Sequence, residues 1–290
     1  MITKKAYAKL NLVLDVTGKR ADGYHLIRTV MHTIDLADDL TFSKNDGERN
    51  LLFLEKDSIV SEDALSLKKD NLILRAANLM QERFALPQKA DIRLRKKIPL
   101  AAGMAGGSAD AAATLLGLNE LFCCNATQEE LQEMALQLGA DVPYCLRGGC
   151  ALAEGIGEEL TMLPSLEGVP VVIAKPEGGI STADIYRRLD AVKDPEHPPV
   201  DAAVEAIRKK DIPSLALAAG NILEAVCRQS VPVIGEIEKS LIEEGAQISR
   251  MTGSGPTVFG IFADTEQAEK AAKALKASFP DLFVAATGLL

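Results

Sequence analysis

Glycines and a serine cluster in residues 99–113 of this 290-residue sequence, which read Pro-Leu-Ala-Ala-Gly-Met-Ala-Gly-Gly-Ser-Ala-Asp-Ala-Ala-Ala. Glycine lets a ligand approach the backbone, and the alanine run that follows favours a helix. A helix start carries N–H groups without intrahelical partners and the positive end of the helix dipole. The stretch therefore predicts an anion site, most often for phosphate, although such glycines can also serve packing alone.

Lys9 and Asn11 are two residues apart in a segment of alternating residues at 6–16. Alternate side chains of a strand point to the same face, so these polar groups share one face, while Leu10 and Leu12 share the other. The polar face either looks into a cleft, where both groups meet a ligand, or is a solvated outer face, which is the usual situation of lysine.

Asp141 follows a glycine that is predicted to end a helix at 127–138, and Pro143 comes two residues later. Because proline pushes the preceding residue to an extended conformation, we expect a fixed loop at 140–143. Asp141 is then either an ordinary turn residue or a positioned carboxylate. A second glycine turn, Thr-Gly-Ser-Gly-Pro, occupies 252–256.

The elements that position these residues alternate between strands and helices, which indicates an α+β chain. Thr127 and Glu130 form a predicted capping box, and Gly139 a predicted helix end. Periodicity predicts strands at 6–16, 30–36, 40–42, 91–95, 150–154, 169–174, 246–251, 257–263 and 282–287. It predicts helices at 70–84, from the glycine loop to about 122, at 127–138, from 181, and at 200–209, 212–227, 232–244 and 265–278.

Composition excludes several classes of protein. The net charge of −9, the absence of tryptophan and an aromatic fraction of 4% argue against a nucleic-acid surface. The five cysteines form no CxxC pair and resemble neither a zinc site nor a disulfide framework. No apolar run is long enough to cross a bilayer, and the first residues do not read as a signal peptide. We therefore expect a cytoplasmic protein that binds neither membranes nor nucleic acid.

The glycine loop lacks both the GxxxxGK[ST] pattern and the GxGxxG dinucleotide fingerprint. Its glycines match a third pattern, because the loop resembles the phosphate-binding motif of the GHMP kinases, which include galactokinase, homoserine kinase, mevalonate kinase and phosphomevalonate kinase. The Lys9–Asn11 strand and the turn at 252–256 are similar to the other two motifs of that family.

The resemblance extends from residue 6 to residue 256. Within the family it is closest to kinases that phosphorylate a cytidine-diphosphate-linked methylerythritol in non-mevalonate isoprenoid synthesis, and the segment at 20–25, Arg-Ala-Asp-Gly-Tyr-His, discriminates best. Alanine replaces a common family glycine at 101, 102 and 105, and a common second serine at 109, which leaves Ser108 as the main side-chain candidate in the loop.

The resemblance implies a two-domain GHMP kinase fold. It combines an N-terminal domain of ribosomal-protein-S5-like type, which we place at 1–163 and which binds ATP, with a C-terminal ferredoxin-like domain at 164–290. The Pro- and Gly-containing stretch at 161–168 agrees with this boundary.

The resemblance also implies roles for individual residues. Asp141 is the candidate base for the substrate hydroxyl, and Lys9 the group that stabilises developing negative charge. The cofactors implied are ATP and Mg²⁺. The ATP phosphates are expected at Pro99, Leu100, Ala101, Ala102, Gly103, Met104, Ala105, Gly106, Gly107, Ser108 and Ala109. The expected substrate contacts are Asn11, Tyr24, His25, Thr182, Tyr186, Gly253 and Ser254, with Tyr186 proposed to stack on the cytosine ring.

Two other functions fit the same motifs. The chain is either another small-molecule kinase of the family, of mevalonate or homoserine type, or a GHMP-fold regulator that binds a ligand without catalysis. The presence of Lys9, Asp141 and the glycine loop together argues against a regulator. The sequence leaves open whether the protein is a monomer or a homodimer.

Overall fold

The structure is a computed structural model that describes residues 1–65 and 70–290. By its internal contacts the described chain forms two compact units, each assembled from separate segments. The first contains Met1–Ala8, Leu36–Leu100 and Ala105–Gly148. The second contains Lys9–Asp35, Ala101–Met104 and Gly149–Leu290. The boundaries of these units differ from those of the domains expected at 1–163 and 164–290, because residues 9–35 group with the second half of the chain.

In the first unit, β4 (Lys89–Arg95) lies between two other strands. It runs parallel to β3 (Leu51–Leu54) and antiparallel to residues 39–45 of β2 (His25–Asn45). The strand β1 (Ile2–Lys19) also pairs with β2. The pairing of β3 with β4 was not predicted from the sequence, because β3 is too short to show a clear period.

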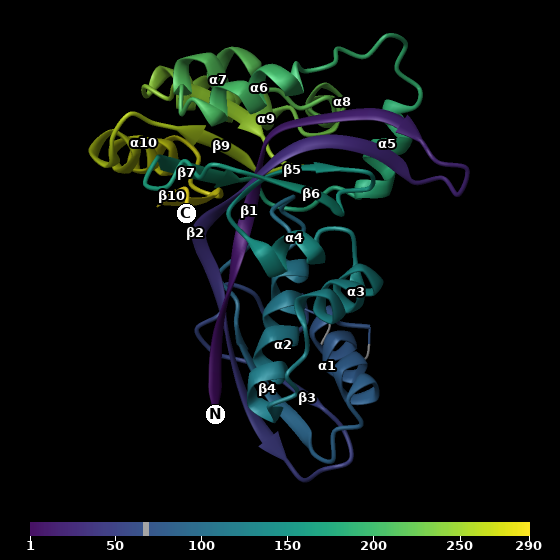
Figure 1. Ribbon diagram of the computed structural model, residues 1–290. Coiled ribbons are helices and arrows are strands. Elements are labelled where there is room, and N and C mark those ends of the chain that lie inside the picture. Colours follow the sequence, from purple (N-terminus) through teal and green to yellow (C-terminus); the bar gives the residue numbers. More distant parts are fainter. Residues whose placement is uncertain (66–69) are drawn as a thin grey trace. The chain divides into compact units, whose positions relative to one another are not determined.

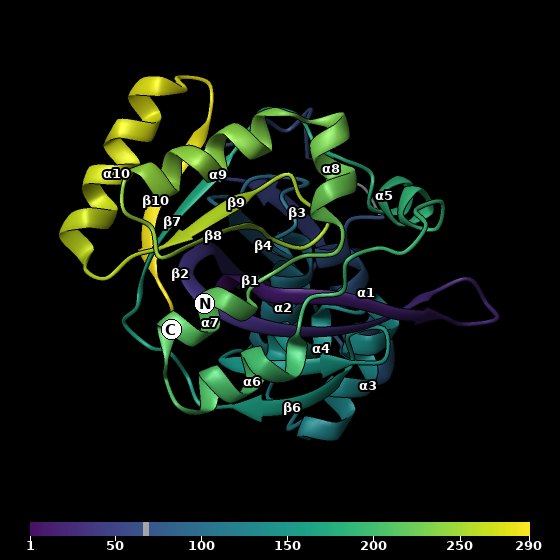
Figure 2. The same ribbon diagram turned by 90° about the horizontal axis from the view of Figure 1, so that it is seen from above.

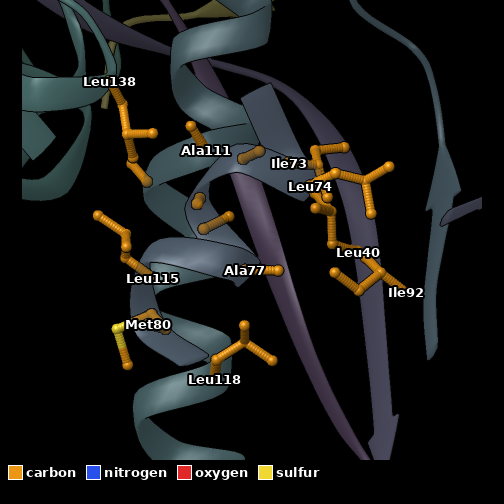
Figure 3. Packing of buried hydrophobic residues seen from close by; sticks show 14 of the residues in the cluster. Leu40, Ile73, Leu74, Ala77, Met80, Ile92, Ala111, Leu115, Leu118 and Leu138 are labelled. Carbon is orange, nitrogen blue, oxygen red and sulfur yellow. The ribbon is translucent and has the colours of Figure 1, made fainter. Parts of the chain in front are cut away.

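Helices cover this sheet and form the core of the first unit. They are α1 (Leu72–Arg83), α2 (Gly106–Phe122), α3 (Gln128–Leu138) and α4 (Val142–Arg147), of which the first three lie side by side in Figure 1. Figure 3 shows Leu115 and Leu118 of α2 among buried side chains from α1 and the strands. The alanine-rich helix α2 is buried over much of its length, because small side chains allow its neighbours to pack closely.

In the second unit, four strands form an antiparallel sheet in the order β10-β7-β9-β8. They are β7 (Pro170–Lys175), β8 (Ile248–Met251), β9 (Val258–Ile261) and β10 (Phe283–Gly288). The helices α9 (Val233–Glu243) and α10 (Thr265–Ser278) pack against this sheet, as Figure 2 shows. A sheet of this kind with helices against it agrees with the expected ferredoxin-like architecture.

The remaining elements of the second unit are two strands and four helices among the described residues. The strand β5 (Cys150–Glu154) pairs with residues 29–32 of β2 and with β6 (Glu159–Leu163). The helices are α5 (Thr182–Leu189), α6 (Val200–Arg208), α7 (Ile212–Ala218) and α8 (Glu224–Ser230). The strand β6 was not predicted from the sequence.

Local capping signals are confirmed. Thr127 and Glu130 form the predicted capping box at the start of α3, and Gly139 ends that helix. Ser181 caps α5 by accepting a hydrogen bond from the Asp184 amide. Signals of this kind succeed because donor and acceptor are three residues apart, so that tertiary structure is not needed to bring them together.

Three predicted elements are corrected by the structure. The strands predicted at 30–36 and 40–42 are parts of one strand, β2. The helix predicted at 212–227 is two helices, because the backbone between them bonds instead to Leu14, which donates to the Gly220 carbonyl and accepts from the Ile222 amide. The loop predicted at 140–143 is the start of α4, where proline is tolerated in the first turn.

In the part of the chain that the structure describes, no helix is both long and apolar enough to cross a membrane.

Candidate active site

Lys9 and Asn11 lie on the buried part of β1, and each is only 4% exposed. The solvated outer face is therefore the wrong alternative for this strand. The Lys9 ammonium donates to Asn11 Oδ1 at 2.5 Å and to the Gly103 carbonyl oxygen at 3.3 Å. The lysine thus contacts the predicted phosphate loop, although 94 residues separate the two in sequence.

The Asn11 side chain is oriented by its neighbours so that its oxygen faces Lys9. Its Nδ2 donates to Thr29 Oγ1 at 2.8 Å, and that hydroxyl in turn donates to the Val13 carbonyl at 2.6 Å. The Asn11 backbone amide donates to Thr252 Oγ1 at 2.8 Å. An ammonium can only donate, so it needs the amide oxygen, and the bond from Nδ2 to Thr29 fixes the amide with that oxygen toward Lys9. Thr29 and Thr252 are thus positioning residues that the sequence did not reveal.

Gly103 and Gly253 face each other where two loops approach closely, and their φ angles are 69° and 57°. A methyl group on Gly103 would lie 2.5 Å from the Thr252 carbonyl oxygen, and one on Gly253 would lie 2.5 Å from the Gly103 carbonyl oxygen. Neither position accepts a side chain without backbone movement, and positive φ adds strain to any other residue. This contact joins residues 101–104 to the turn at 252–256.

Asn221 holds that turn in place. Its Nδ2 donates to the carbonyls of Met251 and Gly253 at 2.9 and 2.8 Å, and its Oδ1 accepts from the Leu223 amide at 3.0 Å. The sequence missed Asn221, because a polar residue inside a predicted helix reads as an exposed position. The Gly-Asn pair at 220–221 is the signal that points to a break there.

The helix α2 begins at Gly106, earlier than Ser108, and Ala105 is its N-cap in the left-handed region with no side-chain cap. The Ala109 amide donates to the Ala105 carbonyl at 2.8 Å, so that N–H is used within the helix. The amides of Gly106, Gly107 and Ser108 precede this first bond and have no carbonyl of the helix to bond. An uncapped helix start with three such amides fits a phosphate group.

The other predicted phosphate-loop residues can contribute through their backbone. The side chains of Ala102 and Met104 are buried, and the Met104 carbonyl accepts from the Lys9 amide at 3.2 Å. Ala101 is exposed with a φ of 48°, and Pro99 offers no N–H. Leu100 precedes Ala101 and is half-buried.

Lys96, one of the cations before the loop, is only 1% exposed. Its ammonium pairs with Asp38 and, at 2.8 Å, with Asp110 of α2. Burial raises the pKa of Asp110 to about 8, and the nearby Asp38 charge adds to this rise against the lowering effect of Lys96. Because its charge is already paired with carboxylates, Lys96 holds the start of α2 through Asp110 and has no free charge to offer to phosphate.

Asp141 lies in the first unit as the N-cap residue of α4 and is half-buried. Its side chain makes no capping hydrogen bond, and among residues 1–65 and 70–290 it has no ion-pair partner within the first unit. The Asp141 side chain is thus not used to cap α4. A half-buried carboxylate with its oxygens available can accept a proton.

The predicted substrate contacts form two groups in the second unit. His25 stacks on Tyr186 with ring centroids 4.7 Å apart, and Tyr24 beside it is 61% exposed. The hydroxyls of Thr182 and Ser254 are 2.8 Å apart, which brings the start of α5 to the glycine turn. The structure therefore brings together residues that the sequence left more than 70 positions apart.

Comparisons with known proteins agree with these motifs. The family model described as GHMP kinases N terminal domain matches residues 71–149, and the model described as GHMP kinases C terminal matches residues 203–281. Mevalonate kinase from L. major, solved with R-mevalonate, has a TM-score of 0.75 at 19% identity and covers 100% of this chain and 96% of its own. At this identity, the likeness shows the fold and nothing more. The two family models, which match residues in both halves of the chain, define the class of protein as the GHMP kinases.

Nearer relatives narrow the class. A 4-diphosphocytidyl-2-C-methyl-D-erythritol kinase of Acetivibrio thermocellus is 44% identical over 286 residues, 99% of either chain. One of Clostridium beijerinckii is 40% identical over 98% of this chain and 99% of its own. A crystal structure of 4-(cytidine 5'-diphospho)-2C-methyl-D-erythritol kinase has a TM-score of 0.82 at 32% identity, with 99% of both chains covered. The chain belongs to the 4-diphosphocytidyl-2-C-methyl-D-erythritol kinase family of GHMP kinases.

Proposed function

We propose that this chain transfers the γ-phosphoryl group of ATP to the 2-hydroxyl of 4-diphosphocytidyl-2-C-methyl-D-erythritol, a step of non-mevalonate isoprenoid synthesis. The observation that carries this proposal is the identity of 40–44% over nearly the whole chain with kinases of that name. The Asp-Gly-Tyr-His segment at 22–25 supports it over mevalonate or homoserine as substrate.

ATP binding is proposed at the start of α2. The amides of Gly106, Gly107 and Ser108 donate to phosphate oxygens, and the positive end of the helix dipole adds to their attraction. Mg²⁺ supplies charge neutralisation between the phosphates and needs only one or two protein oxygens, because it keeps several waters. The Ser108 hydroxyl fits such a role, since it makes no side-chain hydrogen bond within the described chain.

Asp141 and Lys9 are proposed as the catalytic pair. The oxygen of the substrate hydroxyl forms a bond to the γ-phosphorus, the bond from that phosphorus to the bridging oxygen of ADP breaks, and the proton passes to the Asp141 carboxylate. Because a carboxylate is a weak base toward an alcohol, the transfer comes late, as the hydroxyl acidifies. An ammonium has three donors, and Lys9 uses two on Asn11 and Gly103, which leaves one for the reacting oxygens.

Substrate binding is proposed at the residues predicted from the sequence. Tyr24, His25 and Tyr186 receive the cytosine end, and the contact of His25 with Tyr186 supports their acting together. Asn11, with Thr182 at the start of α5 and the turn residues Gly253 and Ser254, receives the rest of the molecule. We further infer that the protein acts in the cytoplasm as a monomer or homodimer, and that the sequence divides functionally at 163/164.

The assignment is tested by coupled measurement of ADP release from ATP and Mg²⁺. We expect turnover only when 4-diphosphocytidyl-2-C-methyl-D-erythritol is present. Equal turnover with mevalonate or homoserine would instead favour another small-molecule kinase of the family. Binding of ATP and substrate without turnover would favour a regulator.

The role of Asp141 is tested by Asp141→Asn in the same assay. We expect the variant to fold and bind ATP with unchanged affinity, and to lose kcat by about 100-fold or more, because general base catalysis contributes on this order. Asp39→Asn, which changes another carboxylate of the first unit that pairs with Lys97, is the matched control. A near-normal kcat for Asp141→Asn would remove this residue from the base role.

A further inference from the structure

The hairpin of β1 and β2 is tied to the end of α5 through one carboxylate. His25, the first residue of β2, places Nε2 at 2.7 Å from Oδ1 of Asp190, the C-cap residue of α5. Lys19, the last residue of β1, donates to the other oxygen of Asp190 at 2.6 Å. All three residues belong to the second unit. Asp190 has no part in the motifs that define the family resemblance.

The ionisation of the Asp190 carboxyl decides which nitrogen of the neutral His25 imidazole carries the proton. Hydrogen bonds from His25 and Lys19 hold the pKa of the Asp190 carboxyl below its ordinary value, so the carboxylate is ionised at neutral pH. An ionised carboxylate can only accept hydrogen bonds. A neutral imidazole beside it therefore carries its single proton on Nε2, and Nδ1 keeps a lone pair.

Nδ1 of His25 is open to a ligand. Among the described residues, no group forms a hydrogen bond with Nδ1 of His25. The atom is also not fully buried, because the fully buried polar atoms without a partner do not include it, so a ligand can reach it. The ring itself is fixed, because the His25 side chain is 12% exposed and packs on the Tyr186 ring at 4.7 Å with an interplanar angle of 34°. The imidazole thus presents one hydrogen-bond acceptor in a defined direction.

An acceptor of this kind distinguishes the two pyrimidine bases. Cytosine carries an amino group, a donor, at the position where uracil carries a carbonyl oxygen, an acceptor. We propose that Asp190 is a positioning residue for base selection: it keeps the His25 proton on Nε2, so that Nδ1 accepts from a cytosine amino group and repels uracil. This inference rests on the proposed function, because it takes the ligand to be a cytidine diphosphate compound.

A merely structural role for Asp190 predicts something different. In that case Asp190 only ties the hairpin to α5, and Lys19 contributes to the same tie. Lys19→Met removes the Lys19 pair but leaves the bond from His25 to Asp190. Asp190→Asn is close in shape, but its amide can donate as well as accept, so it no longer sets the position of the imidazole proton.

The experiment is calorimetric titration of CDP and of UDP into the full chain and both variants. We expect the wild type to bind CDP more tightly than UDP, and Asp190→Asn to lose about tenfold of this preference, the typical effect of one hydrogen bond. Lys19→Met should keep the preference even if it weakens both ligands. An unchanged ratio for Asp190→Asn, or an equal loss for Lys19→Met, would overturn the proposal.

A second measurement does not depend on the variants. Long-range ¹H–¹⁵N NMR of the free wild type should show the His25 proton on Nε2, and a proton on Nδ1 alone would overturn the proposal. The two levels of inference fail in different ways. Failure to bind either nucleotide contradicts the substrate assignment together with base selection, whereas tight CDP binding with an unaltered ratio in Asp190→Asn contradicts only the role of Asp190.

Discussion

Lys9 is a buried cation whose hydrogen-bond partners in the described chain are an amide oxygen and a backbone carbonyl. A buried ammonium usually lies next to a carboxylate, because an uncompensated charge is expensive to remove from water. Lys9 therefore has unused positive charge to offer to an anionic ligand. This arrangement is the reason why we propose that Lys9 acts on the reacting groups rather than lying on a solvated surface.

Substitution of Lys9 tests this reading. Lys9→Met should lower kcat by about 100- to 1,000-fold and change the KM for substrate much less, because the lost charge acts mainly on the transition state. Steady-state kinetics with both substrates gives the two constants. Lys5→Met, at an exposed position on the same strand, is the control and should leave both unchanged. A KM effect as large as the kcat effect would assign Lys9 to ground-state binding.

The two facing glycines make a separate prediction. Gly253→Ala should destabilise the protein by about 2–3 kcal/mol and weaken ATP binding, because its methyl group would meet the Gly103 carbonyl oxygen at 2.5 Å. Gly168→Ala is the matched control, since its φ is 85° and a methyl group there meets nothing within 4 Å. The control should lose about 1 kcal/mol from positive φ alone.

Thermal unfolding and ATP titration of both glycine variants provide the measurements. The proposed contact predicts a larger loss for Gly253→Ala than for the control, and an effect on ATP only in that variant. Equal losses in the two would mean that the loops separate easily and that the contact has no role in the site.

At the scale of elements, three buried ionisable side chains join β2, the residue that follows β4, and α2. Asp38 of β2 accepts from the backbone amides of Lys97 and Ile98 at 2.5 and 2.8 Å and pairs with Lys96. Asp110 of α2 pairs with Lys96, and its second oxygen is buried without a partner among the described residues. The two carboxylates are therefore not equivalent, because both oxygens of Asp38 have partners whereas one oxygen of Asp110 has none among the described residues.

This difference predicts opposite effects of two similar substitutions. The raised pKa of Asp110, about 8 against 3.8 in the unfolded chain, means that the folded state holds a proton which the unfolded state releases between these values. Stability therefore falls as pH rises through this window. Asp110→Asn removes the effect and should stabilise the protein at pH 8 by about 1 kcal/mol or more, whereas Asp38→Asn should destabilise it by about 3 kcal/mol.

Chemical denaturation between pH 5 and pH 8 measures both variants against the wild type. The gain from Asp110→Asn should grow as the pH rises, which separates it from a change in packing. Destabilisation by Asp110→Asn at pH 8 would show that its pair with Lys96 outweighs the burial of the charge.

At the scale of the whole molecule, His32 holds together parts of the second unit that are far apart in the sequence. Its Nδ1 lies 2.9 Å from the Thr33 carbonyl, and its Nε2 accepts from the Leu166 amide at 3.0 Å. Ser165 donates to the Leu290 carbonyl at 2.7 Å beside it. Because a backbone amide can only donate, this network requires a neutral imidazole with its proton on Nδ1.

A pH dependence of folding follows. Burial lowers the pKa of His32 below its ordinary 6.5, so its contribution to stability is complete above pH 6.5 and is lost as the pH falls toward the folded value. Unfolding free energies measured from pH 7.5 to pH 5 should therefore decrease by up to about 1.4 kcal/mol per unit below 6.5 through this residue. His32→Asn should flatten that slope, and His197→Asn, at a mostly exposed position, should not. Equal slopes in wild type and His32→Asn would contradict this account.

The prediction from sequence succeeded where a signal involves neighbouring residues, or where several family motifs follow one another along the chain in the family's order. The capping box of α3, the alternation in β1 and the helix after the glycine loop depend on neighbours within a few residues, and each is present. The glycine loop, the Lys9–Asn11 strand, the segment at 20–25 and the turn at 252–256 together indicated the family. Predictions failed where a residue distant in the sequence replaces the local hydrogen bonds. At residues 220–222 the predicted helix is interrupted, because the backbone there bonds to Leu14.

The sequence by itself determined the class of enzyme, and it predicted the phosphate loop and the residues expected to act. Only the tertiary structure decided that Lys9 is buried against the Gly103 carbonyl, that Lys96 pairs with two carboxylates, and that Asp190 contacts His25. The physical reason is distance along the chain. Burial and hydrogen bonding depend on partners such as Asn11 and Thr252, 241 residues apart, and residue spacing carries no information about contacts that exist only after folding.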